Sequence, residues 1–322
     1  MTQPLFQALL VDDMTEVDKV IRARLHSEVV LVRQVSEYII HSGGKRLRPA
    51  LVVLAAKALG YRGPNHHEMA AVVEFIHTAT LLHDDVVDGS DLRRGRDTAN
   101  ALFGNAASVL VGDFLYSRAF QMMVGVHNMR VMEVLSEATN VIAEGEVLQL
   151  MNCNDPDIDE AAYLQVIRYK TAKLFEAAGR LGAIVNGAPR EIEDALGNYG
   201  MHLGTAFQIV DDVLDYSGDR DLIGKNVGDD LAEGKPTLPL LFAMKHGTPD
   251  EAELIRQAIL AGDASRFTEI LGIVQRTGAL DHAQRQAQAE ADLASRALEC
   301  LPDSQYKMAL LELSSFAVAR EF

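Results

Sequence analysis

FIHTATLLHDDVVD, residues 75–88, is an apolar segment that ends in three aspartates. The apolar residues extend back along the chain and recur at three- and four-residue steps, which is the period of an α-helix. We therefore predict a helix over 66–88. The aspartates Asp84, Asp85 and Asp88 lie at its C-terminal end, and their spacing places all three on one side of the helix.

Helical periodicity extends over most of the chain, and no run shows the convincing alternation of a strand. The prolines fall at or near the ends of the predicted segments, where they do not interrupt helical hydrogen bonds. Further helical segments are predicted over 17–40, 50–59, 106–125, 128–152, 159–186 and 190–216. We predict an all-α protein with one domain over 1–322. The part from 249 to 322 is more charged and richer in alanine, which indicates a peripheral helical part.

The composition excludes several classes of protein. The 322 residues include 46 Asp plus Glu and 30 Lys plus Arg, a net charge of −16, which argues against a nucleic-acid partner. The two cysteines allow no disulfide framework, and no Cys/His cluster has the spacing of a zinc site. The first residues do not have the pattern of a signal peptide, and no apolar run is long enough for a membrane span. We expect a cytoplasmic protein.

A second copy of the aspartate pattern ends another apolar helix. FQIVDDVLD, residues 207–215, places Asp211, Asp212 and Asp215 at the same spacing. Like charges so close repel one another, and the C-terminal end of a helix disfavours negative charge. A divalent cation offsets these costs, and Mg²⁺ binds carboxylates together with substrate phosphates. We predict that both clusters bind Mg²⁺; the alternative for each copy is a solvated acidic helix end.

Cations cluster near glycines in this acidic chain. Glycine permits positive φ and close backbone approach, the N-terminus of a helix attracts anions, and arginine binds phosphate oxygens in pairs. No Walker A pattern is present, so a P-loop nucleotide site is excluded. Arg46 alone is interpreted as a surface cation. The other members of the set are Lys45 and Arg48 in GGKRLRP (43–49), Arg93 and Arg94 after the first aspartate cluster, Lys170 beside Thr171, and Lys225 and Lys235 after the second cluster.

At this point the sequence resembles the trans-polyprenyl diphosphate synthases, and the bacterial octaprenyl diphosphate synthases among them. The resemblance covers about two hundred residues. It is carried by GGKRLRP (43–49), HDDVVDGSDLRRG (83–95), EGEVLQLMN (144–152), KTA (170–172), FQIVDDVLD (207–215) and GKPTLPLL (234–241). The family implies an all-α, isoprenoid-synthase-type bundle around a deep central cavity, with the two aspartate motifs facing each other at its mouth. It also implies a homodimer.

The resemblance implies an enzyme that adds isopentenyl diphosphate to an allylic diphosphate such as farnesyl diphosphate. The catalytic set is Asp84, Asp85, Asp88, Lys170, Asp211, Asp212, Asp215 and Lys235, and its aspartates hold Mg²⁺, commonly three ions. The allylic substrate contacts Arg93, Lys170, Thr171, Gln208 and Lys235, to which we add Lys225. Isopentenyl diphosphate contacts Lys45, Arg48, His77 and Arg94.

Product length depends in this family on residues just before the first motif. A bulky aromatic residue four or five positions before it stops the chain short, whereas Ala79 and Thr80 here are small. Ile76 lies a turn further back, and Met123 is a candidate for the cavity floor because methionine is flexible and apolar. We predict a product near forty carbons, octaprenyl diphosphate, which would serve as a quinone side chain. Plain core packing is the alternative for each of these residues.

Several other functions fit parts of the pattern. A C45 solanesyl diphosphate synthase is one alternative, because the sequence does not distinguish eight from nine isoprene units. A C15 or C20 synthase is another, against which the small Ala79 and Thr80 argue. A class I terpene cyclase has one DDxxD, but its second metal motif differs from the one at 211–215. A non-catalytic partner subunit would have eroded aspartates, and here both clusters are intact. Membrane contact is expected to be transient, during release of the product.

Overall fold

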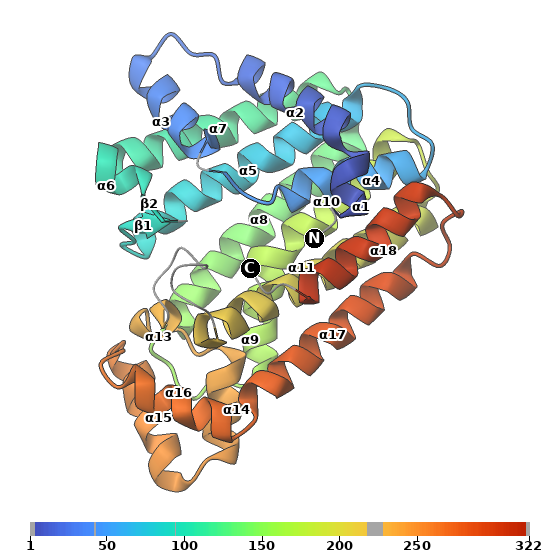
Figure 1. Cartoon of the computed structure of the whole chain (residues 1–322). Coiled ribbons are helices and arrows are strands. Elements are labelled where there is room, and N and C mark those ends of the chain that lie inside the picture. The colour runs from blue at the N-terminus through green and yellow to red at the C-terminus, as the bar shows by residue number, and fades with distance from the viewer. Residues whose placement is uncertain (1–3, 42, 94, 218–227, 320–322) are drawn as a thin grey trace. The chain divides into compact units, whose positions relative to one another are not determined.

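The structure is a computed structural model that describes residues 4–41, 43–93, 95–217 and 228–319. The described chain is helical except for one short hairpin and the connections (Figure 1). The N-terminal helices are α1 (Leu5–Leu9), α2 (Val11–Arg24), α3 (Val30–His41), α4 (Leu47–Ala58), α5 (Asn65–Val87), α6 (Ala99–Phe103) and α7 (Asn105–Gly125). Next come α8 (Met129–Asn152), α9 (Glu160–Ile167), the π-helix η1 (Arg168–Ala172), α10 (Lys173–Val185) and α11 (Arg190–Ser217). The last are α13 (Asp229–Ala232), α14 (Leu238–His246), α15 (Pro249–Ala261), α16 (Phe267–Arg276), α17 (Ala279–Ala297) and α18 (Gln305–Val318).

The predicted all-α fold is confirmed, with differences in detail. The segment predicted over 17–40 is two helices, because the chain leaves the helix after Arg24 and resumes at Val30. The segment predicted over 159–186 contains a π-turn. Strands β1 (Leu92–Arg93) and β2 (Arg96–Asp97) form an antiparallel hairpin, and two residues a strand are too few for an alternating pattern to show in the sequence. Within the described ranges, no helix combines the length and apolar character that a bilayer crossing requires.

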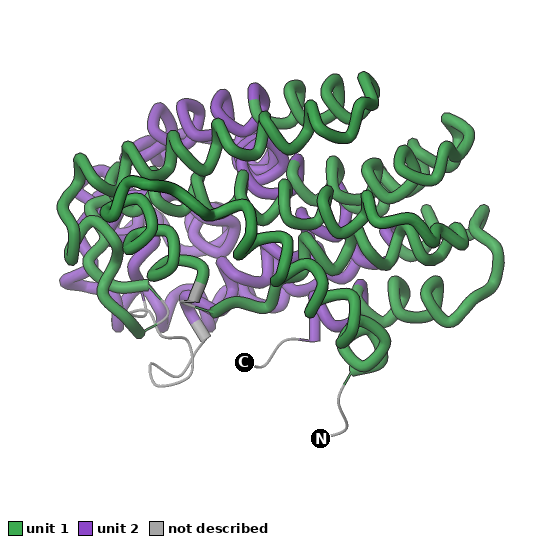
Figure 2. Tube along the Cα trace, turned by 90° about the horizontal axis from the view of Figure 1, so that it is seen from above, with its two compact units in different colours: residues 1–139, 174–200, 295–313 green, residues 140–173, 201–294, 314–322 purple. Residues whose placement is uncertain are grey.

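By contacts the chain divides into two compact units (Figure 2). Unit 1 holds residues 1–139, 174–200 and 295–313, and unit 2 holds 140–173, 201–294 and 314–322. The first aspartate cluster thus belongs to unit 1 and the second to unit 2. The single domain with a peripheral part from residue 249 stays a prediction.

In unit 1 the helix that carries the first aspartate cluster is buried along most of its length. Helix α5 packs against α2, α4 and α7 (Figure 1). Its residues Val72, Phe75 and Ile76 are fully buried, and so are most apolar residues of α4. This packing holds the polar C-terminal end of α5 in place, because the apolar turns before it cannot move without exposing core surface.

The crossing of α10 and α11 in unit 1 depends on two glycines. A Cβ atom at Gly179 would lie 2.1 Å from the carbonyl oxygen of Leu196, and one at Gly200 would lie 2.1 Å from the carbonyl oxygen of Phe175. The two backbones therefore approach so closely that no side chain fits between them at either point. Tyr199, in the same region, is fully buried and donates a hydrogen bond to the carbonyl oxygen of Leu310 at 2.7 Å.

In unit 2 an apolar cluster surrounds the second aspartate motif. It joins Tyr163 of α9 and Ile209, Val210 and Val213 of α11 with Leu238 at the start of α14. Alanines of α17, at positions 283, 287 and 291, complete this cluster. The aspartates thus alternate along α11 with residues that are fixed in the core.

We expect Gly179→Ala to destabilise the protein by about 1–3 kcal/mol, because the added methyl group meets backbone that cannot move aside. The matched control is Gly272→Ala in α16, where a Cβ atom would meet nothing within 4 Å. Since alanine is the better helix former, the control should be neutral or stabilising by up to about 1 kcal/mol. Urea unfolding measures both changes, and equal stability of the two variants would contradict the close crossing.

Candidate active site

The first aspartate cluster lies at the C-terminal end of α5. Asp84 and Asp85 belong to its last turn, and Asp88 caps it. The β1–β2 hairpin follows directly, and Arg93 of β1 donates from Nε and Nη2 to Oδ1 of Asp85 at 2.7 and 2.6 Å. The hairpin therefore brings a predicted substrate-binding arginine onto a predicted metal ligand.

The second carboxylate oxygen of Asp85, Oδ2, is buried without a hydrogen-bond donor among the described residues. Asp85 as a whole is completely buried. A buried carboxylate oxygen without a partner is costly, and a cation removes that cost. The carboxylates of this cluster fit the oxygen-ligand preference of Mg²⁺.

Two arginines of the glycine-rich segment 43–49 have different surroundings. Gly43 and Gly44 have φ of +80° and +148°, so the expected positive φ is confirmed at both. The interpretation of Arg46 as a surface cation is wrong, because its side chain is three-quarters buried and ion-paired with Asp18. Arg48 lies with its guanidinium carbon 4.4 Å from the centre of the Phe175 ring and donates to Nε2 of His77 at 3.3 Å.

Two of the residues predicted to bind isopentenyl diphosphate, Arg48 and His77, are therefore together within unit 1. Lys45 lies nearby in sequence and its side chain is exposed. Arg94, the fourth of this set, lies outside the described residues, and so does Lys225 of the allylic set.

In unit 2 a chain of hydrogen bonds holds the second aspartate cluster. The Thr171 hydroxyl donates to Oε1 of Gln208 at 3.0 Å, and Nε2 of Gln208 donates to Oδ1 of Asp212 at 2.8 Å. The Tyr163 hydroxyl donates to Oδ2 of Asp212 at 2.6 Å. Three predicted residues are thus joined, and Tyr163 is an addition that sequence spacing did not reveal.

Burial and neighbouring carboxylates raise the pKa values of Asp212 and Asp215. Desolvation, then the charge of Asp230, raises the pKa of Asp212 and of Asp215 from 3.8 to about 8. Asp215 receives backbone N–H groups of Gly228 and Asp230 at 3.2 and 3.3 Å, which only partly offset the repulsion. Burial and the nearby acids also raise the pKa of Tyr163, so its hydroxyl keeps the proton that it donates.

Lys170 and Thr171 lie in the π-turn η1. The extra residue in such a turn widens the helix and redirects the side chains beside it, and π-turns are frequent at functional sites. Gly145 of α8 makes room for it, because a Cβ atom there would lie 2.6 Å from the backbone nitrogen of Lys170. The next residue, Glu146, binds Nζ of Lys170 at 2.5 Å. Glu146 lies in EGEVLQLMN (144–152), which the sequence analysis used only as part of the family resemblance and not as a site.

Lys235 also has a carboxylate partner. Its Nζ is ion-paired with Glu233, and its backbone N–H donates to the carbonyl oxygen of Asp230 at 2.8 Å. Arg93, Lys170 and Lys235 are therefore all held by acidic side chains. An anionic substrate would have to replace or share these partners.

The residues predicted to set product length lie in the core of unit 1. Ile76, Ala79 and Met123 are fully buried. Thr80 is half-buried, and its hydroxyl donates to the carbonyl oxygen of His77 at 2.8 Å. The burial agrees equally with a cavity wall and with plain packing, so their role stays a prediction.

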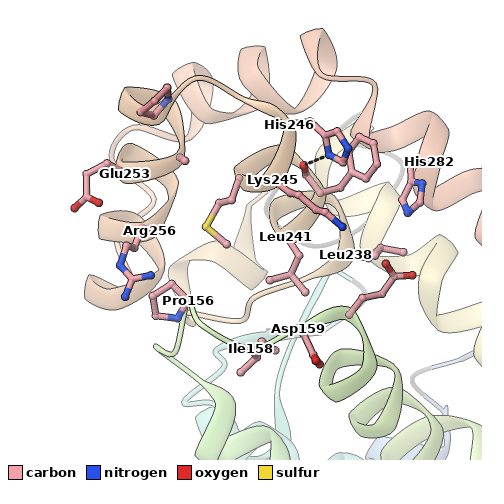
Figure 3. Close-up of a pocket in the computed structure, with 15 residues that line it drawn as sticks. Pro156, Ile158, Asp159, Leu238, Leu241, Lys245, His246, Glu253, Arg256 and His282 are labelled. Atoms are coloured by element: carbon pink, nitrogen blue, oxygen red, sulfur yellow. Dashed lines mark hydrogen bonds between the residues drawn. The ribbon is translucent and has the colours of Figure 1, made fainter.

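A separate cavity of about 670 Å³ lies in unit 2 (Figure 3). None of the predicted site residues lines it. The Phe242 ring stacks on His246 and on His282, with ring centres 3.9 and 4.2 Å apart. The acidic and basic residues around it, Asp159, Glu160, Glu253, Lys245 and Arg256, have mixed charge and define no single ligand.

Known proteins are similar to this chain along its whole length. The family model described as polyprenyl synthetase matches residues 29–274. Octaprenyl diphosphate synthase of Escherichia coli is 56% identical over 97% of both chains. The nonaprenyl-diphosphate synthase (geranyl-diphosphate specific) of Rhodobacter capsulatus is 47% identical over 97% of this chain and 96% of its own. The crystal structure of a Caulobacter crescentus polyprenyl synthase, complexed with calcium and isoprenyl diphosphate, matches with a TM-score of 0.96. It is 46% identical, over 99% of this chain and 98% of its own.

The raised pKa values predict how stability depends on pH without metal. A carboxyl group whose pKa is raised by folding stabilises the folded chain at low pH. That contribution is complete below about pH 3.8 and is lost as the pH rises through about 8. We expect these groups to lower the melting temperature in metal-free buffer as the pH rises from about 4 to about 8.

Asp215→Asn should flatten that decline, because the amide that replaces the carboxyl group does not ionise. Each group of this kind contributes about 1.4 kcal/mol for each pH unit in the titrating range. Thermal unfolding at several pH values measures the slope. An equal slope in the variant and the wild type would show that Asp215 is already ionised near pH 6.

Proposed function

This chain belongs to the polyprenyl synthetase family, and on that basis we propose how its own residues perform the reaction of a long-chain trans-polyprenyl diphosphate synthase. The chain is a prenyltransferase, which condenses isopentenyl diphosphate with an allylic diphosphate. Its likeness to octaprenyl diphosphate synthases over almost the entire chain is the observation that carries the proposal.

We propose that the two aspartate clusters hold Mg²⁺ ions that bind the allylic diphosphate. The buried, unpartnered oxygen of Asp85 and the raised pKa values of Asp212 and Asp215 support this assignment, because each is a cost that a bound cation removes. The calcium in the related Caulobacter crescentus structure points the same way. When bound, Mg²⁺ supplies positive charge that stabilises the leaving diphosphate.

The cations complete the binding of both substrates. In our proposal Arg93, Lys170 and Lys235 move from their carboxylate partners to the allylic diphosphate. Thr171 and Gln208 orient it. Lys45, Arg48, His77 and Arg94 bind isopentenyl diphosphate, and the contact between Arg48 and His77 keeps two of these groups together.

The chemistry follows from this arrangement of charge. The bond between C1 and the diphosphate oxygen breaks, and the double bond of isopentenyl diphosphate attacks the allylic cation. A proton is then lost to the departed diphosphate, and the product is five carbons longer. The site has to exclude water, which would otherwise capture the cation as an alcohol.

We propose octaprenyl diphosphate, with about forty carbons, as the product. The absence of a bulky side chain at Ala79 and Thr80 supports a long product. The relative named for eight prenyl units is 56% identical and the one named for nine is 47% identical, so a C45 product is the second candidate. We further propose a homodimer that acts in the cytoplasm and contacts a membrane only to release its product for use as a quinone side chain.

Purified protein incubated with isopentenyl diphosphate and farnesyl diphosphate should form a product near C40 only when Mg²⁺ is present. Mass spectrometry measures the product length. A C15 or C20 product would overturn the long-chain proposal. Release of a cyclic hydrocarbon would indicate a terpene cyclase, and a complete lack of condensation with any allylic primer would indicate a partner subunit.

Ala79→Tyr should shorten the product by several isoprene units, because the ring would block the path of the growing chain. Mass spectrometry and the melting temperature are measured together. The matched control is Ala70→Tyr, at an equally buried position of α5 nine residues earlier. If Ala79 lines a cavity, its variant folds normally while the Ala70 variant loses stability by overpacking. An unchanged product length from a folded Ala79→Tyr protein would exclude this position.

A further inference from the structure

One carboxylate of the second cluster is held at both of its oxygens. Asp212 is only 4% exposed. Its Oδ1 accepts a hydrogen bond from Gln208 at 2.8 Å, and its Oδ2 accepts one from the Tyr163 hydroxyl at 2.6 Å. Two donors from two directions fix the plane of the carboxylate, and a rotation about its side-chain bonds would break both hydrogen bonds.

Tyr163 itself has little freedom to move. Its ring is 4% exposed and belongs to the apolar cluster with Ile167, Ile209 and Val213. Tyr163 lies in the first turn of α9. Asp159 caps the N-terminus of this helix, and its side chain accepts a hydrogen bond from the N–H of Ala162 at 2.8 Å. The phenol is thus a rigid group whose only polar atom is directed at Asp212.

We propose that Tyr163 is a positioning residue that orients Asp212 for divalent-cation binding; the inference rests on the proposed function of the second cluster. Each carboxylate oxygen has two lone pairs, and one hydrogen bond leaves the other lone pair for a metal. A carboxylate fixed in this way pays no further conformational entropy when the cation binds. Partners that fix metal ligands commonly change metal affinity by 10–100-fold when removed.

A purely structural role is the competing explanation, since a buried tyrosine hydroxyl needs an acceptor somewhere. The two explanations differ in what the loss of the hydroxyl changes. A structural hydroxyl affects the melting temperature and leaves the affinity for a cation unchanged. A positioning hydroxyl affects that affinity even where the fold is intact.

Tyr163→Phe removes the hydroxyl and keeps the ring. The matched control is Tyr199→Phe, because Tyr199 is equally buried and its hydroxyl also makes one short hydrogen bond, to a backbone carbonyl in unit 1. The probe is Mn²⁺ alone, added to the full-length protein and followed by the electron paramagnetic resonance signal of the free ion. The melting temperature without metal is recorded for every variant.

We expect Mn²⁺ binding at one class of sites to weaken about tenfold in Tyr163→Phe and to stay at the wild-type value in Tyr199→Phe. In an Asp212→Asn background the Tyr163 substitution should have no further effect, because the ligand that it orients is gone. Equal affinity of Tyr163→Phe and wild type would overturn the proposal, and so would a wild-type chain that binds no Mn²⁺.

This test separates the inference from the proposed function. A chain that binds Mn²⁺ through Asp212 and Tyr163 but condenses no substrate would retain the positioning role and lose the enzymatic one. A chain that condenses substrate with unchanged metal affinity in Tyr163→Phe would retain the function and lose the inference.

Discussion

The electrostatic cost of grouping carboxylates at buried helix ends governs much of this structure. Asp85 is fully buried, and Asp212 and Asp215 have raised pKa values because burial and Asp230 oppose their ionisation. Coulomb repulsion grows as water is excluded, so the partners of these groups must come from the protein or from a ligand. Arg93 partly neutralises Asp85, and the hydroxyl of Tyr163 partly stabilises Asp212. The cost that remains uncompensated would favour the binding of a cation, as we propose for both clusters.

The cationic side chains near these clusters also have partners of opposite charge. Lys170 is paired with Glu146, and Arg93 with Asp85, so neither is an isolated positive charge in the unliganded chain. Such pairing lowers the cost of placing cations in partly buried positions. In the proposed mechanism, a diphosphate has to compete with these carboxylates for Arg93 and Lys170. An anion that accepts two hydrogen bonds from an arginine competes better than a small anion such as chloride.

The sequence predicted the helices well where apolar periodicity is long, as over 66–88 and 190–216. The sequence-based prediction was incomplete where local geometry interrupts the regular helical repeat. Nothing in RYKTA reveals a π-turn, because the extra residue is accommodated by Gly145 on another helix. Spacing placed Gln208 on the same face as the second cluster but could not find Tyr163, forty-nine residues before Asp212. Long-range partners of this kind depend on tertiary packing, which a single sequence does not encode as a pattern.

Product length is the property that the fold itself determines least. Relatives named for eight and for nine prenyl units are 56% and 47% identical to this chain, and each match covers 97% of it. In the proposed mechanism, the aspartates and cations act on the diphosphate end of each substrate, which is the same whatever the length of the tail. Length must therefore be set where the tail lies, by the volume of a few apolar side chains. Ala79 remains a candidate because its side chain is small and it lies five residues before Asp84, one to two turns of α5 from the first aspartate cluster.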